Sequence, residues 1–286
     1  MTRLKRKLIF WALIIIFPII ALAIILYSFG FRLSIHEGGI VSTGGIFISS
    51  VPTTGAKIFL DDKFIKETTL IARSTFIQGL TPGKYKVRVE RDNAYSWEKE
   101  LTVMPEYITE ARAFLFNTDP EGEMIERGDF TVINLWDDKT LELITSEDKS
   151  RFFDIETNSF LAITPEQNDE VVELAEENEE RVLFQDDKNV WVEIKDNYLP
   201  YFTSAFQFKL METPSSLRNI AFYPRRDAVI ASYSNGIFVI ELDGRGGGHN
   251  ITPLYKGKEP NMVMPDPDER IIYILDDGNL IKLSIL

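Results

Sequence analysis

Paired aspartates are the side chains in this sequence whose type and spacing could most readily do chemistry. Two carboxylates held about 5–10 Å apart in a cleft can cleave a glycosidic bond. Each pair, however, lies at a predicted hairpin tip, where Asp is favoured because its side chain bonds the local backbone. We therefore interpret them as turn residues. The four pairs are Asp61-Asp62, Asp137-Asp138, Asp186-Asp187 and Asp276-Asp277.

Cysteine and histidine, which serve as zinc ligands and in nucleophilic catalysis, are scarce. The chain has no cysteine, and its two histidines, His36 and His249, lie in glycine-rich loops. No Asp-x-Asp-x-Asp-Gly calcium loop and no histidine pair at zinc spacing occurs. A triad that uses His249 stays open, although no Gly-x-Ser-x-Gly elbow supports it. We predict no metal, no cofactor and no catalytic residue.

Two further groups of residues could bind a ligand. Residues 244–248, Gly-Arg-Gly-Gly-Gly, could cradle an anion, but they lack the Gly-Lys-Ser/Thr of a phosphate loop. We expect them to be a flexible connection. Aromatic side chains could stack on a sugar ring, although each candidate also fits an inward strand position, as part of the core. The candidates are Trp97, Trp136, Trp191 and Tyr198.

The elements that must position these side chains begin with an apolar run. Residues 8–29 contain no charged side chain over 22 positions. A helix of this length spans about 33 Å, and the hydrocarbon core of a bilayer is about 30 Å thick. Membrane helices tolerate an internal proline such as Pro18. We predict one transmembrane helix.

Charge around this run predicts the topology. Residues 1–7 carry four basic and no acidic side chains, so they should stay in the cytoplasm as a basic tail, with residues from about 33 onward outside. A cleavable signal peptide is the alternative, and Ala21-Leu22-Ala23 resembles a cleavage site. Because that tripeptide lies inside the apolar run, we favour an uncleaved anchor in the cell membrane.

The exported part is acidic and contains no cysteine. The formal net charge is −13, and residues 1–32 carry five basic and no acidic side chains, so residues 33–286 carry −18. Nucleic acid is therefore not expected as a partner, because phosphate contacts need a basic face. Without disulfides, the exported part must rely on a hydrophobic core.

Short strands follow a glycine-rich segment. Residues 30–44 show neither helical nor strand periodicity and are expected to be a flexible linker. Residues 45–117 contain about seven short apolar or alternating stretches separated by turns such as Leu80-Thr81-Pro82-Gly83. Residues 84–90 alternate without a break, which requires one buried strand face. We predict a small antiparallel β-sandwich.

This segment resembles the PEGA family. The similarity rests on residues 50–61, SVPTTGAKIFLD, on residues 80–89, LTPGKYKVRV, and on Ala94-Tyr95. Thr54 stands where the family usually has its name-giving glutamate, and Ala94 replaces a glycine. The resemblance implies a small β-sandwich of surface and envelope proteins without known catalysis.

Repeats follow a linker predicted at residues 118–126. In residues 127–286, a strand, a tight turn and a second strand recur about four times. Lys139, Lys188, Gly236 and Gly278 mark the turns, 49, 48 and 42 residues apart. Repeats of this length built from short strands indicate propeller blades, here resembling divergent WD40 or TolB-like repeats. We predict an all-β chain after the helix, with either a closed ring or an open arc of blades.

One segment within the repeats is ambiguous. Residues 169–181, DEVVELAEENEER, have helical propensity. The blade frame instead places a strand at 171–174 and a hairpin loop at 176–180, and we adopt the strand.

Two classes of function fit these observations. The first is a membrane-anchored, non-catalytic envelope protein, a binding or structural module for a surface glycan or a protein. The second is an extracytoplasmic hydrolase of glycan or peptide. We favour the first, because the sequence lacks recognisable nucleophile and metal motifs.

Overall fold

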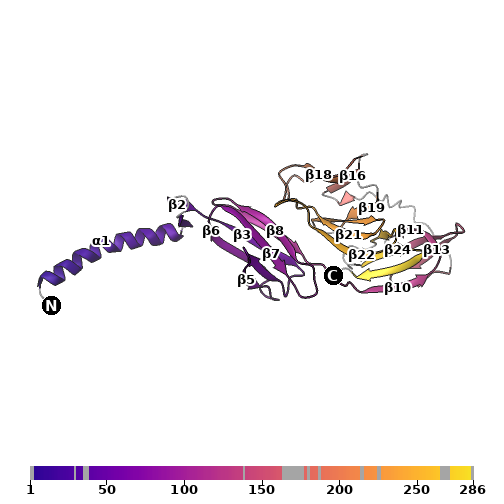
Figure 1. The fold of residues 1–286 in the computed structure, drawn as a ribbon, viewed down its shortest axis with the longest axis horizontal. Helices are drawn as coiled ribbons and strands as arrows, with labels where there is room; N and C mark the ends of the chain where they lie inside the picture. Colours follow the sequence, from indigo (N-terminus) through magenta and orange to yellow (C-terminus); the bar gives the residue numbers. More distant parts are fainter. Residues whose placement is uncertain are drawn as a thin grey trace.

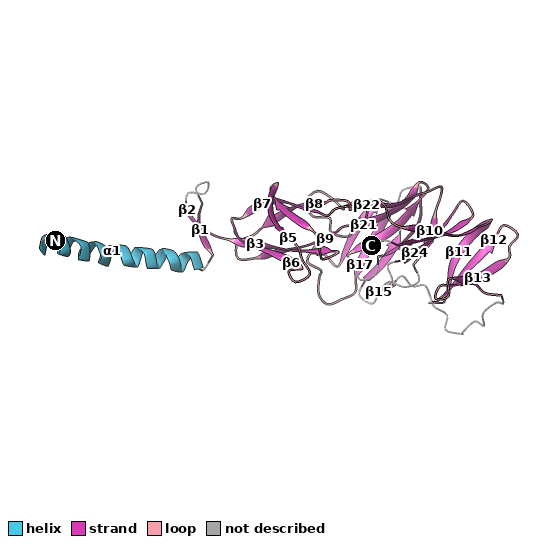
Figure 2. Cartoon of the chain, turned by 90° about the horizontal axis from the view of Figure 1, so that it is seen from below, coloured by secondary structure: helices cyan, strands magenta, loops and turns pink. Residues whose placement is uncertain are grey.

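The structure is a computed structural model, which describes residues 3–28, 30–34, 39–137, 139–162, 177–178, 181–185, 188–212, 216–223, 227–264 and 271–284. The molecule is elongated, with a helix, a β-sandwich and a β-repeat domain in a row (Figure 1). The same row is seen after a quarter turn (Figure 2). The predicted fold class, all-β after one N-terminal helix, is confirmed.

Helix α1 (Arg3–Ser28) contains the predicted apolar run. Its stretch Phe10–Ser28 is long and apolar enough to cross a membrane, and none of it is buried inside the protein. Pro18 lies within the helix. Since none of this span is buried inside the protein, lipid is an environment that would accommodate its apolar side chains.

A hairpin follows the helix, where the sequence predicted a flexible linker over residues 30–44. Strands β1 (Phe31–Ser34) and β2 (Gly39–Ser42) pair antiparallel, with Phe31 opposite Ser42. Gly30, at φ 84°, turns the chain out of the helix, and its carbonyl accepts a hydrogen bond from the Thr43 amide at 3.0 Å. The expectation of an unstructured segment was wrong because these backbone bonds do not depend on side-chain periodicity.

The sandwich has two sheets and the seven strands expected. One sheet has the order β6–β3–β9, and the other β5–β4–β7–β8. The core lies between them and includes Ile46, Ile48, Ile58 and Leu101. The strands are β3 (Gly44–Val51), β4 (Lys57–Leu60), β5 (Lys63–Glu67), β6 (Ser74–Leu80), β7 (Gly83–Glu90), β8 (Trp97–Val103) and β9 (Ile108–Phe114).

The prediction of a wholly antiparallel sandwich was wrong in one pair. Strands β3 and β9 are parallel, with Gly45 opposite Ile108 and Val51 opposite Phe114. Both strands therefore run away from the helix. The parallel pair brings the chain out of the sandwich at the end that faces the repeat domain, which an antiparallel pair could not do.

The alternation of strand β7 has the predicted register. Val87 and Val89 are fully buried, whereas the Arg88 side chain lies on the other face, 4.4 Å from the Phe59 ring centroid. Val89→Asp should therefore destabilise the protein by several kcal/mol, because it places an unpaired charge in the core. Arg88→Asp should cost little. Urea denaturation compares the two variants, and equal midpoints would refute this register.

The described residues of the repeat domain form four four-stranded sheets. The first is β11 (Phe130–Asp137), β12 (Thr140–Thr145), β13 (Ser150–Asp154) and β14 (Ser159–Phe160). The second is β15 (Glu177–Asn178), β16 (Arg181–Gln185), β17 (Asn189–Ile194) and β18 (Gln207–Glu212). The third is β19 (Leu217–Phe222), β20 (Ala228–Tyr233), β21 (Gly236–Glu241) and β22 (Ile251–Lys256). The fourth is β23 (Asn261–Val263), β24 (Ile271–Asp276), β25 (Asn279–Ser284) and β10 (Gly122–Arg127).

Strand β10 corrects the predicted domain boundary. Residues 118–126 were expected to be a linker and the repeats to begin at 127, but β10 pairs antiparallel with the last strand, β25, from Gly122 opposite Leu283 to Arg127 opposite Asn279. The first strand of the domain thus completes its last sheet. Its sequence, GEMIER, is largely charged because β10 is an edge strand and most of its side chains contact water. The strand was therefore not recognised from its sequence.

Shared cores show how the sheets stack. Ile230 of the third sheet packs with Ile272 of the fourth, and Tyr273 of the fourth packs with Leu141 of the first. Val229 of the third packs with residues of the second. The order is first, fourth, third, second. Among the described residues no core cluster joins the first sheet to the second, which fits an open arc.

The repeat alignment was wrong for the first copy. The turn at Lys139 joins the first two strands of its sheet, whereas the other three markers join the second and third strands. The equivalent turn lies at residues 146–149. Hairpin turns rich in Asp and Lys look alike in sequence. Aligning the first repeat one strand out of position therefore still gives the same order of strand, turn and strand.

Burial at the marked positions was predicted only in part. Ile230 and Ile272 are fully buried as expected, but Phe184 is 37% exposed and stacks on Trp191. It lies on a face of the second sheet that no other described sheet covers. Gly236 is buried, although we expected it to be exposed.

The ambiguous segment is described only in part. Residues 171–174, where we predicted a strand, lie outside the described residues. Strand β15 at Glu177–Asn178 falls where we expected a hairpin loop and pairs with β16.

Candidate functional site

A group of buried charges joins the sandwich to the repeat domain. Lys99 of β8 and Glu241 at the end of β21 have side chains only 1% and 4% exposed, and Asp243 is fully buried. With Arg245 these residues form what we call the interdomain charge cluster. Buried charges are costly unless they are paired, so their arrangement shows what the cluster does.

Strand β8 positions Lys99 by simple alternation. Its residues Trp97, Lys99, Leu101 and Val103 are buried, and the residues between them are exposed. A lysine at an inward-facing strand position needs an acidic partner. The core cluster of the sandwich is apolar and does not supply one. The partners come from the repeat domain instead.

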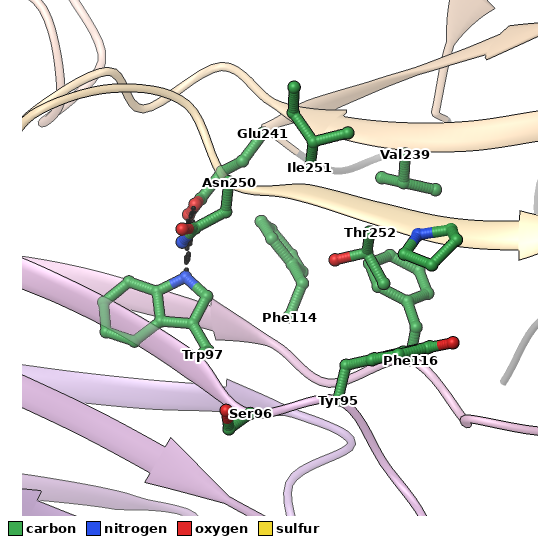
Figure 3. A pocket seen from close by; sticks show the side chains of 11 residues that line it. Tyr95, Ser96, Trp97, Phe114, Phe116, Val239, Glu241, Asn250, Ile251 and Thr252 are labelled. Atoms are coloured by element: carbon green, nitrogen blue, oxygen red, sulfur yellow. Dashed lines mark hydrogen bonds between the residues drawn. The ribbon is translucent and has the colours of Figure 1, made fainter.

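Glu241 lies at the centre of the cluster. Its Oε2 is 3.2 Å from the Lys99 Nζ and accepts a hydrogen bond from the Asn250 Nδ2 at 2.8 Å. The Trp97 Nε1 donates to both carboxylate oxygens, at 3.1 and 3.2 Å (Figure 3). Lys99 also donates to the Asp243 carbonyl and lies 3.7 Å from the Asp243 carboxylate. Two sandwich side chains thus bind one repeat-domain carboxylate.

The glycine-rich loop after Glu241 docks on the sandwich. Arg245 binds Asp243 through Nε at 2.9 Å and Nη2 at 2.8 Å, and its Nη2 also donates to the Glu110 carbonyl at 2.8 Å. A Cβ on Gly246, at φ 73°, would lie 2.3 Å from the Glu100 carbonyl oxygen. The expectation of a flexible connection was therefore wrong, since the glycine permits a close backbone approach.

A second ion-pair group extends the interface. Asp227 is 2.8 Å from the Arg181 Nη2 and 3.5 Å from the Arg112 Nη1. The guanidinium groups of Arg112 and Arg245 each lie 5.1 Å from the centroid of the Tyr201 ring. Strand β9 is therefore tied to both the second and the third sheets.

Burial shifts the pKa of Glu241 in the cluster and that of the neighbouring His249. It raises the pKa of Glu241 to about 7, an effect that Lys99 and the Trp97 hydrogen bond oppose. Burial also lowers the pKa of His249, whose Nδ1 lies 2.7 Å from the Glu241 carbonyl oxygen. His249 is thus a neutral partner in the interface at neutral pH.

The raised pKa of Glu241 predicts a pH effect on stability. Between pH 4.5 and about 7 the folded protein binds more protons at Glu241 than the unfolded chain does, so the free energy of unfolding should fall as pH rises through this window. The Glu241→Gln variant should lack this component. Urea denaturation of both proteins from pH 5 to 8 measures it, and parallel pH profiles would contradict the shift.

A small cavity of about 130 Å³ lies beside Glu241. Figure 3 shows the aromatic rings of Tyr95, Trp97, Phe114 and Phe116 on the sandwich side, facing the repeat domain. Among the described residues that line the cavity, Glu241 is the one carboxylate. Residues of both the sandwich and the repeat domain line this cavity, so it lies at the interface between the two domains.

The four candidate aromatic residues do not form one site. Trp97 is 3% exposed, so it is not a stacking surface for a ligand in solution. Trp136 is half-buried against Phe152 at a centroid distance of 4.9 Å, and Trp191 is half-buried on the second sheet. Tyr198 is 81% exposed. The sequence patterns could not separate these environments because each residue also fitted an inward strand position. For Tyr198 that expectation was wrong, since it lies in the connection between β17 and β18.

Asp61-Asp62 lies in a turn, as predicted, whereas Asp276 is the buried last residue of β24 and only Asp277 of that pair lies in the turn. Asp61 and Asp62 have φ values of 47° and 61°, and Asp277 has 49°. Asp276 is buried and accepts hydrogen bonds from the Tyr255 hydroxyl and the Lys258 amide, both at 2.9 Å. Asp138 and residues 186–187 lie outside the described residues, as does His36.

The interdomain charge cluster was not predicted from the sequence. A signal was present, because Lys99 shares the inward parity of Trp97 and Leu101. Its partners lie more than 140 residues away, and no local pattern marks them.

Comparison with known proteins gives no assignment. No protein family and no curated protein matches the sequence. One similar solved structure is a structural genomics protein of unknown function from Bacteroides thetaiotaomicron, with 11% sequence identity and a TM-score of 0.23. The match covers 80% of this chain and 64% of that protein.

Proposed function

We propose that this chain is a membrane-anchored, extracytoplasmic envelope protein that acts as a non-catalytic binding or structural module for a surface glycan or a protein. The observation that carries the proposal is the interdomain charge cluster. It joins the sandwich and the repeat domain by buried ion pairs at the far end of the sandwich from helix α1. The resemblance of the sandwich to the PEGA family agrees with an envelope location.

The cluster supports a role in presenting the repeat domain away from the membrane, because it holds this domain against the sandwich. Paired buried charges resist separation, since each would be left without its partner. With the sandwich between them, the repeat domain would be held at a set distance from the bilayer. Basic residues before the apolar run favour a cytoplasmic N-terminus.

An uncleaved anchor has a direct consequence for the mature protein. Mass spectrometry of the protein from membranes should find an N-terminus at or next to Met1, and the protein should stay in the membrane fraction after carbonate washing. An N-terminus near Ile24 would show that the apolar run is a cleaved signal peptide instead.

A ligand screen tests the proposed activity. The full-length protein in lipid nanodiscs is incubated with labelled envelope glycans and peptidoglycan, and both binding and product formation are measured. We expect binding without turnover. Tyr198→Ala tests the most exposed candidate residue, and Phe64→Ala, 53% exposed on the sandwich, is its control. Turnover of any of these substrates would refute the proposal and favour a hydrolase.

A further inference from the structure

Exposed apolar side chains gather at the end of the sandwich that faces helix α1. Met104 and Tyr107 of the β8–β9 loop are 53% and 65% exposed, and Ile108 at the start of β9 is 62% exposed. A single exposed apolar residue is ordinary, but three within five positions form a patch that favours contact with a partner. We call these three residues the loop patch.

Backbone hydrogen bonds tie this loop to the end of the helix. The Gly30 amide donates to the Tyr27 carbonyl at 3.1 Å, and the Thr43 amide donates to the Gly30 carbonyl at 3.0 Å. The Glu106 amide donates in turn to the Thr43 carbonyl at 3.0 Å, and the Ser42 hydroxyl donates to the Glu106 carboxylate at 3.2 Å. Only the hairpin junction at Thr43 therefore lies between the helix end and the loop.

The loop is also fixed against the first strand of the sandwich. A Cβ on Gly44 would lie 2.2 Å from the Met104 carbonyl oxygen and 2.8 Å from that of Tyr107. The Gly45 amide donates to the same Tyr107 carbonyl at 3.1 Å. Because the backbone is held on β3, the exposed side chains of the loop patch occupy a defined place beside the helix end.

We propose that the loop patch inserts into the interfacial layer of the bilayer that α1 spans, an inference that rests on the proposed membrane anchoring. The apolar span of α1 ends at Ser28. Beyond the hydrocarbon core, the polar layer extends about 5–8 Å on each side of a bilayer. Tyrosine is enriched at this depth, because its ring is apolar and its hydroxyl reaches water.

This contact restricts the angle between the sandwich and the bilayer surface. The helix gives one attachment to the bilayer, and the loop patch gives a second one beside it. Together they fix the angle at which the sandwich and the repeat domain leave the surface, which a flexible linker would not do.

Depth-dependent fluorescence quenching tests the inference on the full-length protein in nanodiscs. The chain has no cysteine, so Pro105→Cys introduces a single labelling site and keeps all three residues of the loop patch. Two reference sites are Ile20→Cys within α1 and Ile71→Cys, 97% exposed before β6. Each labelled protein is quenched with iodide from water and with nitroxide lipids from the bilayer.

Four outcomes are distinguishable. We expect shallow nitroxide lipids to quench the label at position 105 severalfold more than the label at position 71. In a variant that combines Met104→Ser, Tyr107→Ser and Ile108→Ser, this lipid quenching at position 105 should decrease. If iodide quenches the label at position 105 as readily as the label at 71, while lipid quenches the label at position 20, the loop patch is in water. The inference then fails, but the proposed anchoring does not. If position 20 is not quenched by lipid, the proposed anchoring fails as well. Protection of position 105 from both quenchers would indicate a protein partner and would also overturn the inference.

Discussion

Replacing Lys99 with methionine should lower the free energy of unfolding by about 3–5 kcal/mol at pH 8, the usual cost of removing one partner of a buried ion pair. The Lys99 side chain is 1% exposed and faces two buried carboxylates, Glu241 and Asp243. Its loss leaves the Glu241 carboxylate without its ion-pair partner. The cost should shrink at pH 5, because burial already favours the protonated form of Glu241.

Matched variants separate this effect from lost packing. Lys84 forms an ion pair with Glu100 in the same sheet, but its side chain is 70% exposed, so Lys84→Met should leave stability close to that of the natural protein. Combining Lys99→Met with Glu241→Gln should recover part of the loss. Urea denaturation followed by circular dichroism measures all four proteins, and equal effects of Lys99→Met and Lys84→Met would show that the cluster does not hold the domains together.

Removing residues 259–286 should cause aggregation and loosen both neighbouring sheets. This truncation deletes β23, β24 and β25 and leaves β10 without its pairing partner. It uncovers Ile230 and Val239 of the third sheet and Leu141 and Leu143 of the first. Stacked repeats depend on their neighbours for a core, so a missing sheet exposes apolar surface on both sides.

Hydrogen exchange distinguishes this result from a local effect. Protection should fall in residues 220–242 and in residues 130–144, while the core of the sandwich keeps its protection. A truncated protein that stays monomeric with unchanged exchange at both segments would contradict the stacked-sheet arrangement.

Local patterns predicted most of the strands but few of their partners. The alternation of β7 was sufficient to place Val87 and Val89 in the core, and the turn at Asp277-Gly278 correctly separated β24 from β25. These features depend on neighbouring residues, so a single sequence contains them. The parallel pairing of β3 with β9 joins residues about 63 positions apart, and nothing local specifies it.

The errors share one physical cause. Strand β10 looks like a linker because its pairing partner, β25, lies at the other end of the domain. The loop around Gly246 looks flexible because its rigidity comes from contact with Glu100 of the sandwich. The sequence around Lys99 does not identify its partner, because only the fold brings Lys99 next to Glu241. Each of these features depends on long-range contact.

Single-pass anchoring with residues 33–286 outside the cytoplasm is the claim on which the proposed function depends. Protease added to spheroplasts that carry the full-length protein, with one epitope before Met1 and one after Leu286, tests it most directly. We expect loss of the C-terminal epitope and protection of a short N-terminal fragment. A protected C-terminal epitope, with both lost after lysis, would place the domains in the cytoplasm and contradict the claim.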